Sequence, residues 1–180
     1  MLETIPEIME DTSDIITNKE AFIINKYIPS YLKGNMWQLY YSKTRDGTSF
    51  RTLMRQCSDK GPVVILVRDI RGNIFGGFYS TDFRHANQYV GTGESFLFKF
   101  TGDNYCLKEW KATGKNNWFC RCDSDGIYMG SEPFSGLFID NTVTNGSTHA
   151  CQTYENTQLS YSDKFRIHKL EIWGFDIESY

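Results

Sequence analysis

Hydrophobic and polar residues follow two different periods along this chain, and the change between them falls near residue 60. Between residues 50 and 57, apolar side chains recur at positions i, i+3, i+4 and i+7, which predicts a helix capped by Thr48 or Ser49. A second helical pattern begins at Asn18, a predicted N-cap, and is broken by Pro29. The first third of the chain is therefore expected to contain the helices.

Beyond residue 60 the apolar segments are short and are bounded by Gly, Asp and Asn, as is typical of strands. Residues 63–67 form a continuous β-branched and aliphatic run, which predicts a strand covered on both faces. Residues 74–79 are expected to return beside it as a hairpin, and Gly76 and Gly77 indicate a bulge or a close backbone approach. The other predicted strands are residues 37–41, 96–100, 105–110, 118–122, 127–129, 136–140 and 167–175. We interpret Asn145-Gly146 as a tight turn.

This order of elements predicts a mostly β (α+β) chain. With about eight or nine strands, two packed sheets are favoured over one open sheet. We therefore expect a two-sheet antiparallel β-sandwich, flanked by two or more short helices near the N-terminus. The 180 residues correspond to a single domain with a sizeable core, since 40% of them are hydrophobic and 16% aromatic.

Charge is unevenly distributed along the chain. Residues 1–17 carry five acidic and no basic side chains, which leaves +2 of the net charge of −3 on residues 18–180. We interpret residues 1–17 as an acidic leader, expected to be mobile, and residues 18–180 as the domain. The near-neutral body argues against nucleic acid as a partner. Without a signal sequence or an apolar run of about 18 residues, a cytoplasmic protein with no transmembrane segment is expected.

The five cysteines lack the spacing of a disulfide framework, so buried and reduced thiols are expected. Cys120 and Cys122 fall on one face of a predicted strand, but a zinc site would need two further ligands. A redox sensor would need an exposed thiol with a lowered pKa. We expect no metal and no cofactor.

The segment Gly91-Thr92-Gly93-Glu94, followed by residues 95–98, holds the main candidate for a functional side chain. A dinucleotide-binding fingerprint is excluded, because Phe96 stands where a third glycine is required and a strand follows. Glu94 lies where the chain is about to run into the core, and an unpaired buried charge there would be costly. We therefore expect Glu94 to accept backbone amide hydrogen bonds across the loop.

A catalytic alternative stays open. His149 and Cys151 stand two residues apart, and together with Glu94 they could supply a base, a nucleophile and an orienting group. The corresponding function would be that of a hydrolase or a peroxide-handling enzyme. The simpler interpretation is a buried Cys151 and a His149 that makes one backbone hydrogen bond.

The order of these motifs resembles the TLDc domain, found in eukaryotic oxidation-resistance proteins and in relatives that carry TBC or LysM domains. The matching residues are Trp37-x-Leu39-x-Tyr41-Ser42, Gly47-x-Ser49-Phe50-x-Thr52-Leu53, the strand pair at 63–78, the segment 91–98, Gly146-x-Thr148-x-x-Cys151-x-Thr153-Tyr154, and Leu170-Glu171-Ile172-Trp173-Gly174-Phe175. Similarity runs from about residue 20 to residue 176. This chain departs from the family at residues 131–135, where glycines are common, and at Asp46, Ser147 and Thr148.

The resemblance implies a β-sandwich and a module that binds other proteins, linked to oxidative stress resistance and to the V-ATPase. It supplies no accepted catalytic mechanism. It implies structural roles for Gly91, Gly93, Glu94, Trp173 and Gly174. The expected partner is a V-ATPase peripheral subunit, bound by a monomer that reaches organelle membranes through that partner.

Overall fold

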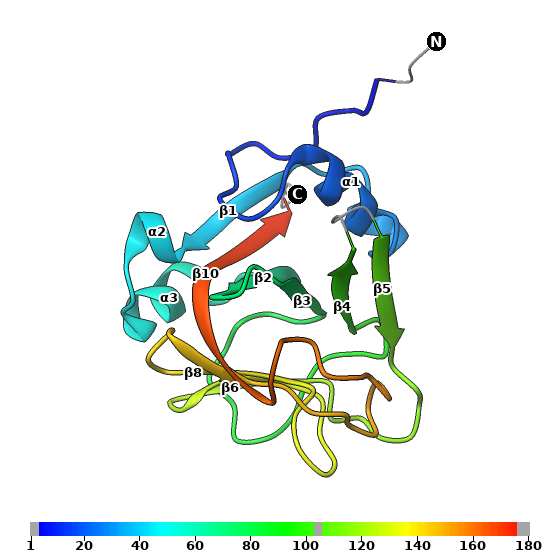
Figure 1. Ribbon diagram of the computed structural model, residues 1–180, viewed down its shortest axis with the longest axis vertical. Helices are drawn as coiled ribbons and strands as arrows, with labels where there is room; N and C mark the ends of the chain where they lie inside the picture. The colour runs from blue at the N-terminus through cyan, green and yellow to red at the C-terminus, as the bar shows by residue number, and fades with distance from the viewer. Residues whose placement is uncertain (1–3, 103–105, 176–180) are drawn as a thin grey trace.

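The computed structural model describes residues 4–102 and 106–175, and strands dominate this part of the chain (Figure 1). The helical elements are α1 (Asn18–Asn25), the 3-10 helix η1 (Ser30–Leu32), α2 (Lys43–Asp46) and α3 (Phe50–Cys57). The strands are β1 (Trp37–Ser42), β2 (Val63–Asp69), β3 (Ile74–Tyr79), β4 (Phe96–Thr101), β5 (Cys106–Lys111), β6 (Cys120–Asp123), β7 (Gly126–Met129), β8 (Leu137–Asp140), β9 (Asn145–Ser147) and β10 (Lys164–Phe175). A mostly β fold with short helices is therefore confirmed. Tyr105, the first residue of one predicted strand, lies outside the described residues.

In the described residues, the ten strands form one antiparallel sheet rather than the two sheets expected from the strand count. The order is β5-β4-β3-β2-β10-β9-β8-β7-β6, and β1 pairs with β10 outside this path. The long strand β10 explains the difference. Its first residues pair with β9 and its later residues with β2 and β1, so its hydrogen bonding joins the two halves (Figure 1).

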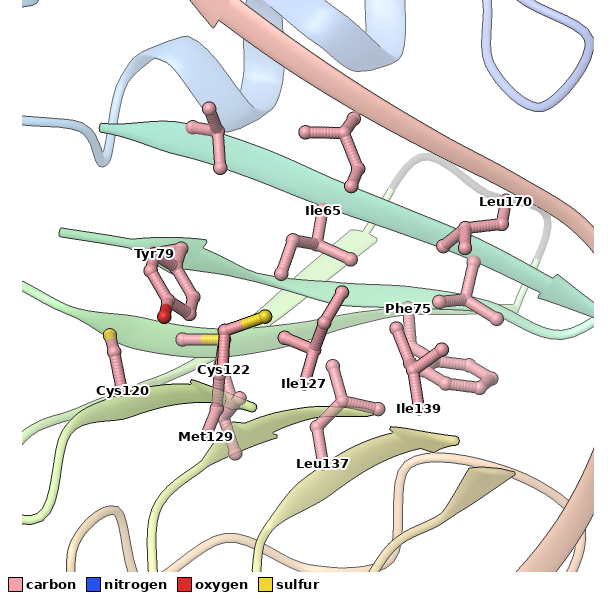
Figure 2. Packing of buried hydrophobic residues seen from close by; sticks show 14 of the residues in the cluster. Ile65, Phe75, Tyr79, Cys120, Cys122, Ile127, Met129, Leu137, Ile139 and Leu170 are labelled. Atoms are coloured by element: carbon pink, nitrogen blue, oxygen red, sulfur yellow. The ribbon is translucent and has the colours of Figure 1, made fainter. Parts of the chain in front are cut away.

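The two halves of this sheet face each other across a shared core. Figure 2 shows Ile65 and Phe75, from β2 and β3, pointing toward Ile127 and Ile139, from β7 and β8. The predicted close approach at the glycine pair is confirmed here: a Cβ at Gly77 would lie 2.5 Å from Met129 Sδ, and one at Gly76 would overlap the Ile65 carbonyl. Glycine is therefore required where the halves meet.

A second core lies on the other face of the β1-to-β4 half, under α1 and the leader. It contains Trp37, Trp173 and Phe78, and α1 contributes Ala21 and Ile24. The ring centroids of Trp37 and Trp173 are 6.3 Å apart. The helices at the N-terminus therefore cover a sheet face that would otherwise expose large aromatic side chains to water.

The described part of the leader, residues 4–17, packs against the domain. Met9, Ile15 and Ile16 are buried in the second core. The amide of Trp37 donates to the Ile8 carbonyl at 2.6 Å, and the amide of Glu10 donates to the Trp37 carbonyl at 2.9 Å. Although this segment is acidic overall, three of its apolar side chains cover one face of the sheet.

The buried carboxylate of Glu171 fastens the leader to β10. It is 1% exposed and accepts hydrogen bonds from the Ser13 hydroxyl at 2.5 Å, the Asp14 amide at 2.8 Å and the Trp173 indole at 3.0 Å. A carboxylate can be buried when several donors replace water. Glu171 therefore joins two segments that lie at opposite ends of the sequence.

Several local predictions need correction. The N-cap of α1 is Thr17, whose amide donates to Glu20 Oε2 at 2.8 Å, while Asn18 accepts a hydrogen bond from the Ile8 amide instead. Asn145-Gly146 lies in β9 rather than in a turn, because the chain turns earlier, at residues 141–144. The predicted cap Ser49 is confirmed, since its hydroxyl accepts from the Thr52 amide at 3.2 Å.

Within the ranges 4–102 and 106–175, none of the helices is long and apolar enough to cross a lipid bilayer.

Replacing Glu171 with Gln is expected to lower the free energy of unfolding by about 1–3 kcal/mol. Both carboxylate oxygens of Glu171 accept hydrogen bonds. In the glutamine side chain one of these oxygens is replaced by an NH₂ group, which cannot accept, so at least one donor would lose its partner. Thermal and denaturant unfolding measure the change. The matched control is Glu132→Gln on an exposed side chain; equal stability of the two variants would contradict this role of Glu171.

Candidate functional site

The glycine–glutamate loop, residues 91–95, precedes β4 and is closed by hydroxyl groups. The Thr92 amide donates to Ser80 Oγ at 2.9 Å, and the Ser95 amide and hydroxyl donate to the Thr92 carbonyl at 3.2 and 3.0 Å. Ser95 is buried, and the Tyr154 hydroxyl lies 2.8 Å from its oxygen. The loop is thus fixed at its base while its tip faces solvent.

The two glycines of the loop differ in what they do. Gly91 has φ +99°, and a Cβ there would lie 2.7 Å from Ser80 Oγ and 3.3 Å from Cys120 Sγ. A Cβ on Gly93 would meet nothing within 4 Å. The backbone therefore requires glycine at position 91 but not at position 93.

Glu94 is exposed, and the hydrogen bonds of its side chain differ from those expected. Its Oε1 accepts from the Thr92 hydroxyl at 3.4 Å, and the Glu94 amide donates back to that hydroxyl at 3.2 Å. In the described part of the chain no backbone amide donates to this carboxylate, because Ser80 and Thr92 close the turn instead. The loop backbone does not need the charge of Glu94.

A cavity of about 270 Å³ lies beside Glu94, and we name it the glycine–glutamate pocket. Its lining includes Tyr27, Pro29, Glu94, Phe96, Glu109 and Lys111. The pocket brings together the segment after α1, the glycine–glutamate loop and strand β5. Glu94 also lies close enough to Tyr31 to add to the effect of burial in raising the pKa of that phenol.

Glu109 is the unusual group of this pocket. Its side chain is 8% exposed, its Oε1 lies 3.9 Å from Lys111 Nζ, and its buried Oε2 accepts no hydrogen bond from any described residue. Burial raises the pKa of Glu109 above 4.5, and the charge of Lys111 partly opposes this. The only hint of this residue in the sequence is its position: one acidic residue between Leu107 and Trp110 in a predicted strand.

The candidate nucleophile Cys151 is buried and donates its thiol hydrogen to Asn156 Oδ1 at 3.2 Å. Burial raises the pKa of this thiol, which disfavours the reactive thiolate. The His149 ring lies against the ring of Phe134, with 4.9 Å between centroids. Across the described residues, no hydrogen bond or ion pair joins Glu94, His149 and Cys151 to one another. Among the described residues, the hydrogen bond of the thiol goes to an amide oxygen and not to a base, so the contacts give the enzymatic alternative no support.

A redox sensor needs an exposed thiol with a lowered pKa, and Cys120 and Cys122 have neither property. Both are buried, and burial raises the pKa of each thiol to about 12. In the ranges that the structure describes, no three His, Cys, Asp or Glu side chains are grouped so that they could hold a metal ion.

The terminal motif is tightly packed. Trp173 is fully buried, and a Cβ at Gly174 would overlap the ring of Tyr40. Both residues lie on β10 and face segments from the N-terminal part of the chain.

A larger cavity of about 380 Å³ lies between β8, β9 and the start of β10. Tyr161, Lys164 and Arg166 line it, and the guanidinium of Arg71 lies 4.4 Å above the Tyr161 ring. Lys164 and Arg166, two positions apart at the start of a predicted strand region, are the signal that could have revealed this basic surface.

Comparison with known proteins connects this structure with a family. The family model of the TLDc domain matches residues 9–176. Nuclear receptor coactivator 7 of Homo sapiens is 30% identical over 176 residues, which cover 97% of this chain and 18% of that protein. Oxidation resistance protein 1 of Rattus norvegicus is 31% identical over 170 residues, or 93% of this chain and 20% of that protein. The chain therefore spans about a fifth of the length of these relatives.

The replacement Gly91→Ala is expected to reduce the free energy of unfolding by about 1–3 kcal/mol, whereas Gly93→Ala should change it little. The reason is the positive φ and the close Ser80 hydroxyl at position 91, neither of which has a counterpart at position 93. Denaturant unfolding of both variants measures the difference. Equal losses at the two positions would refute this view of the loop.

For Glu109→Gln we expect a gain in stability that grows with pH. Because the pKa of Glu109 is raised by burial, the folded parent holds a proton that the unfolded chain releases, so its stability falls as pH rises through the raised pKa. The glutamine variant carries no titratable group at this position, so it does not lose stability in this way as pH rises. Melting temperatures between about pH 4 and pH 7 test it; a difference between variant and parent that does not depend on pH would contradict the buried carboxylate.

Proposed function

Since this chain belongs to the TLDc domain family, we propose that it is a non-enzymatic protein-interaction module with a role in oxidative stress resistance. Support comes from the family match and from the name of the oxidation resistance proteins that resemble the chain. We further infer that it acts in the cytoplasm as a monomer and reaches organelle membranes through its partner.

One observation carries the interaction role. Glu94 sits at the rim of the glycine–glutamate pocket as an exposed carboxylate that the loop backbone does not use. Exposed aromatic side chains lie near it: Tyr27 lines the same pocket, and Tyr31 is electrostatically coupled to Glu94. Aromatic side chains with a charged group beside them are typical of protein interfaces. Because the fold depends little on the Glu94 side chain, this carboxylate is available to bind a partner.

We propose that the partner is the peripheral part of the V-ATPase. This rests on the resemblance to the TLDc domain. The catalytic alternative gains no support from the placement of Glu94, His149 and Cys151, because the thiol bonds to Asn156 and the histidine ring contacts Phe134.

The folded domain is proposed to begin before residue 18. The family match starts at residue 9, and Met9, Ile15 and Ile16 are buried against the sheet. Three buried side chains of this size contribute several kcal/mol of burial free energy. Part of the acidic leader is then an element of the domain.

Capture from a eukaryotic cell extract tests the proposed partner. The immobilised chain should retain V-ATPase peripheral subunits, and Glu94→Gln should reduce this retention about tenfold, as expected for the loss of an interfacial charge. The melting temperature of Glu94→Gln should stay close to that of the parent, because its side chain makes one long hydrogen bond.

The matched control is Glu132→Gln, which removes an exposed carboxylate from another loop and should leave retention unchanged. Absence of V-ATPase subunits among the retained proteins would overturn the choice of partner. A large drop in the melting temperature of Glu94→Gln would instead return this residue to an architectural role.

A further inference from the structure

We propose that the cavity between β8, β9 and the start of β10 binds an acidic peptide segment of a partner protein, with one aromatic side chain of that peptide in the cavity and its carboxylates on the surrounding cations. We name it the basic cavity, and its lining includes Phe138, Ser147, Tyr161, Lys164 and Arg166. The proposal goes beyond docking on the V-ATPase, because the basic cavity and the glycine–glutamate pocket share no lining residue.

The hollow follows from the register of three neighbouring strands. Ser147 of β9 pairs with Phe138 of β8 on one side and with Lys164 of β10 on the other. Cross-strand partners point to the same face of a sheet, and Ile139, the next residue along β8, points to the opposite face, into the shared core. A short serine side chain between two long ones leaves a groove over β9 on the outer face.

Aromatic side chains form the walls of the basic cavity. Phe138 and Tyr161 are both half-buried, and the Tyr161 hydroxyl accepts from the Arg166 amide at 3.1 Å. The ring centroids of Phe138 and Tyr128 are 4.7 Å apart, so the aromatic surface continues onto β7. The volume of about 380 Å³ is within the range of pockets that bury organic groups, roughly 300–1,000 Å³. An inserted aromatic ring would therefore find both room and aromatic neighbours.

Three cations around the basic cavity are left without an anion. Lys164 and Arg166 are exposed and line it, and the guanidinium of Arg71 lies 4.4 Å from the centroid of the Tyr161 ring. Among the described residues, none of these three cationic groups makes an ion pair or donates a hydrogen bond. Their charges are therefore available to an external anion.

Two carboxylates near these cations are held by their own turns. Asp140 lines the cavity, and its Oδ1 accepts from the Thr142 amide at 2.9 Å and from the hydroxyl of the same residue. Asp163 Oδ1 accepts from the Lys164 amide at 2.9 Å. In the part of the chain that the structure describes, neither carboxylate forms an ion pair with Lys164 or Arg166. The positive charge is thus not neutralised from within.

The positive charge continues from the cavity along β10, which favours a peptide over a small anion. Lys43 Nζ donates to the Ile167 carbonyl at 2.8 Å. Repulsion from Arg166 and Lys169, added to the larger effect of burial, lowers the pKa of Lys43. At about 3.3 Å per residue, residues 164–169 extend over about 16 Å, the length of roughly five extended residues. A peptide can contact this whole surface, whereas a phosphate ion would contact only one part of it.

The concave shape also favours a peptide over a membrane or a nucleic acid. A hollow with aromatic walls accommodates an inserted side chain, whereas a membrane surface meets the protruding parts of a protein. Nucleic acid would need a longer basic stripe, on a body with more positive charge than this one.

Fluorescence anisotropy with a labelled peptide, in which two glutamates stand on each side of one phenylalanine, tests the site. The peptide should bind in a saturable way. A second peptide with glutamines in place of the glutamates, and a third with alanine in place of the phenylalanine, should each bind about tenfold more weakly or worse. The first change removes the carboxylates, and the second removes the side chain that fills the cavity.

The double variant Lys164→Gln/Arg166→Gln should bind the acidic peptide about tenfold more weakly. Its melting temperature should stay that of the parent, because both side chains are exposed and form no ion pair in the described residues. The matched control is Lys26→Gln/Lys33→Gln, which removes the same charge from exposed positions that follow α1 and η1. The control should bind the peptide as the parent does.

No saturable binding, equal binding of the glutamine peptide, or equal losses in the two double variants would each overturn the proposal. Binding to phosphatidylserine vesicles that depends on Lys164 and Arg166, in place of binding to the peptide, would assign this surface to membranes and overturn it as well. Peptide binding by a chain that retains no V-ATPase subunits would leave the basic cavity standing and remove only the proposed partner.

Discussion

The hydrogen bonding of β10 holds the two halves of the sheet together, and both cores are built on this strand. One strand of 12 residues pairs with β9 at its start and with β2 and β1 further along, so it holds both halves of the sheet in one ladder. On the same strand, Glu171 fastens the leader and Trp173 fills the second core. A change in β10 would therefore be felt in both cores and at the N-terminus.

Local patterns predicted the elements well where a single period decides the outcome. The helical spacing of residues 50–57 gave α3, and the apolar run at 63–67 with its return gave the β2–β3 hairpin. The single sheet could not be foreseen in this way, because it depends on which partners β10 selects. The contact between the leader and β10 also joins distant segments, since Ser13 and Glu171 are 158 positions apart. At Asn145-Gly146 a strong local turn signal was overridden by pairing with β8 and β10.

In the candidate site too, local sequence patterns revealed some residues, whereas only the tertiary contacts revealed their roles. The glycines and Glu94 were visible in the sequence because their types are unusual before a strand. Their roles came from tertiary contacts, which show Gly91 to be required by the backbone and Glu94 to be free of it. Glu109 could not be recognised as a site residue, because only the folded chain shows that its Oε2 is buried without a partner in the described residues. The pocket gathers charged and aromatic side chains, whereas Cys151 bonds to Asn156 and the His149 ring lies against Phe134.

We propose that this TLDc domain docks on its partner through the glycine–glutamate pocket. Hydrogen–deuterium exchange of the chain, alone and in complex with the proposed V-ATPase peripheral subunits, tests it most directly. Slower exchange on binding is expected in residues 93–96 and in residues 109, 111 and 112, two separate segments that line the pocket. Slower exchange confined to other surfaces, such as the basic cavity beside Tyr161, with no change in these two segments, would contradict it.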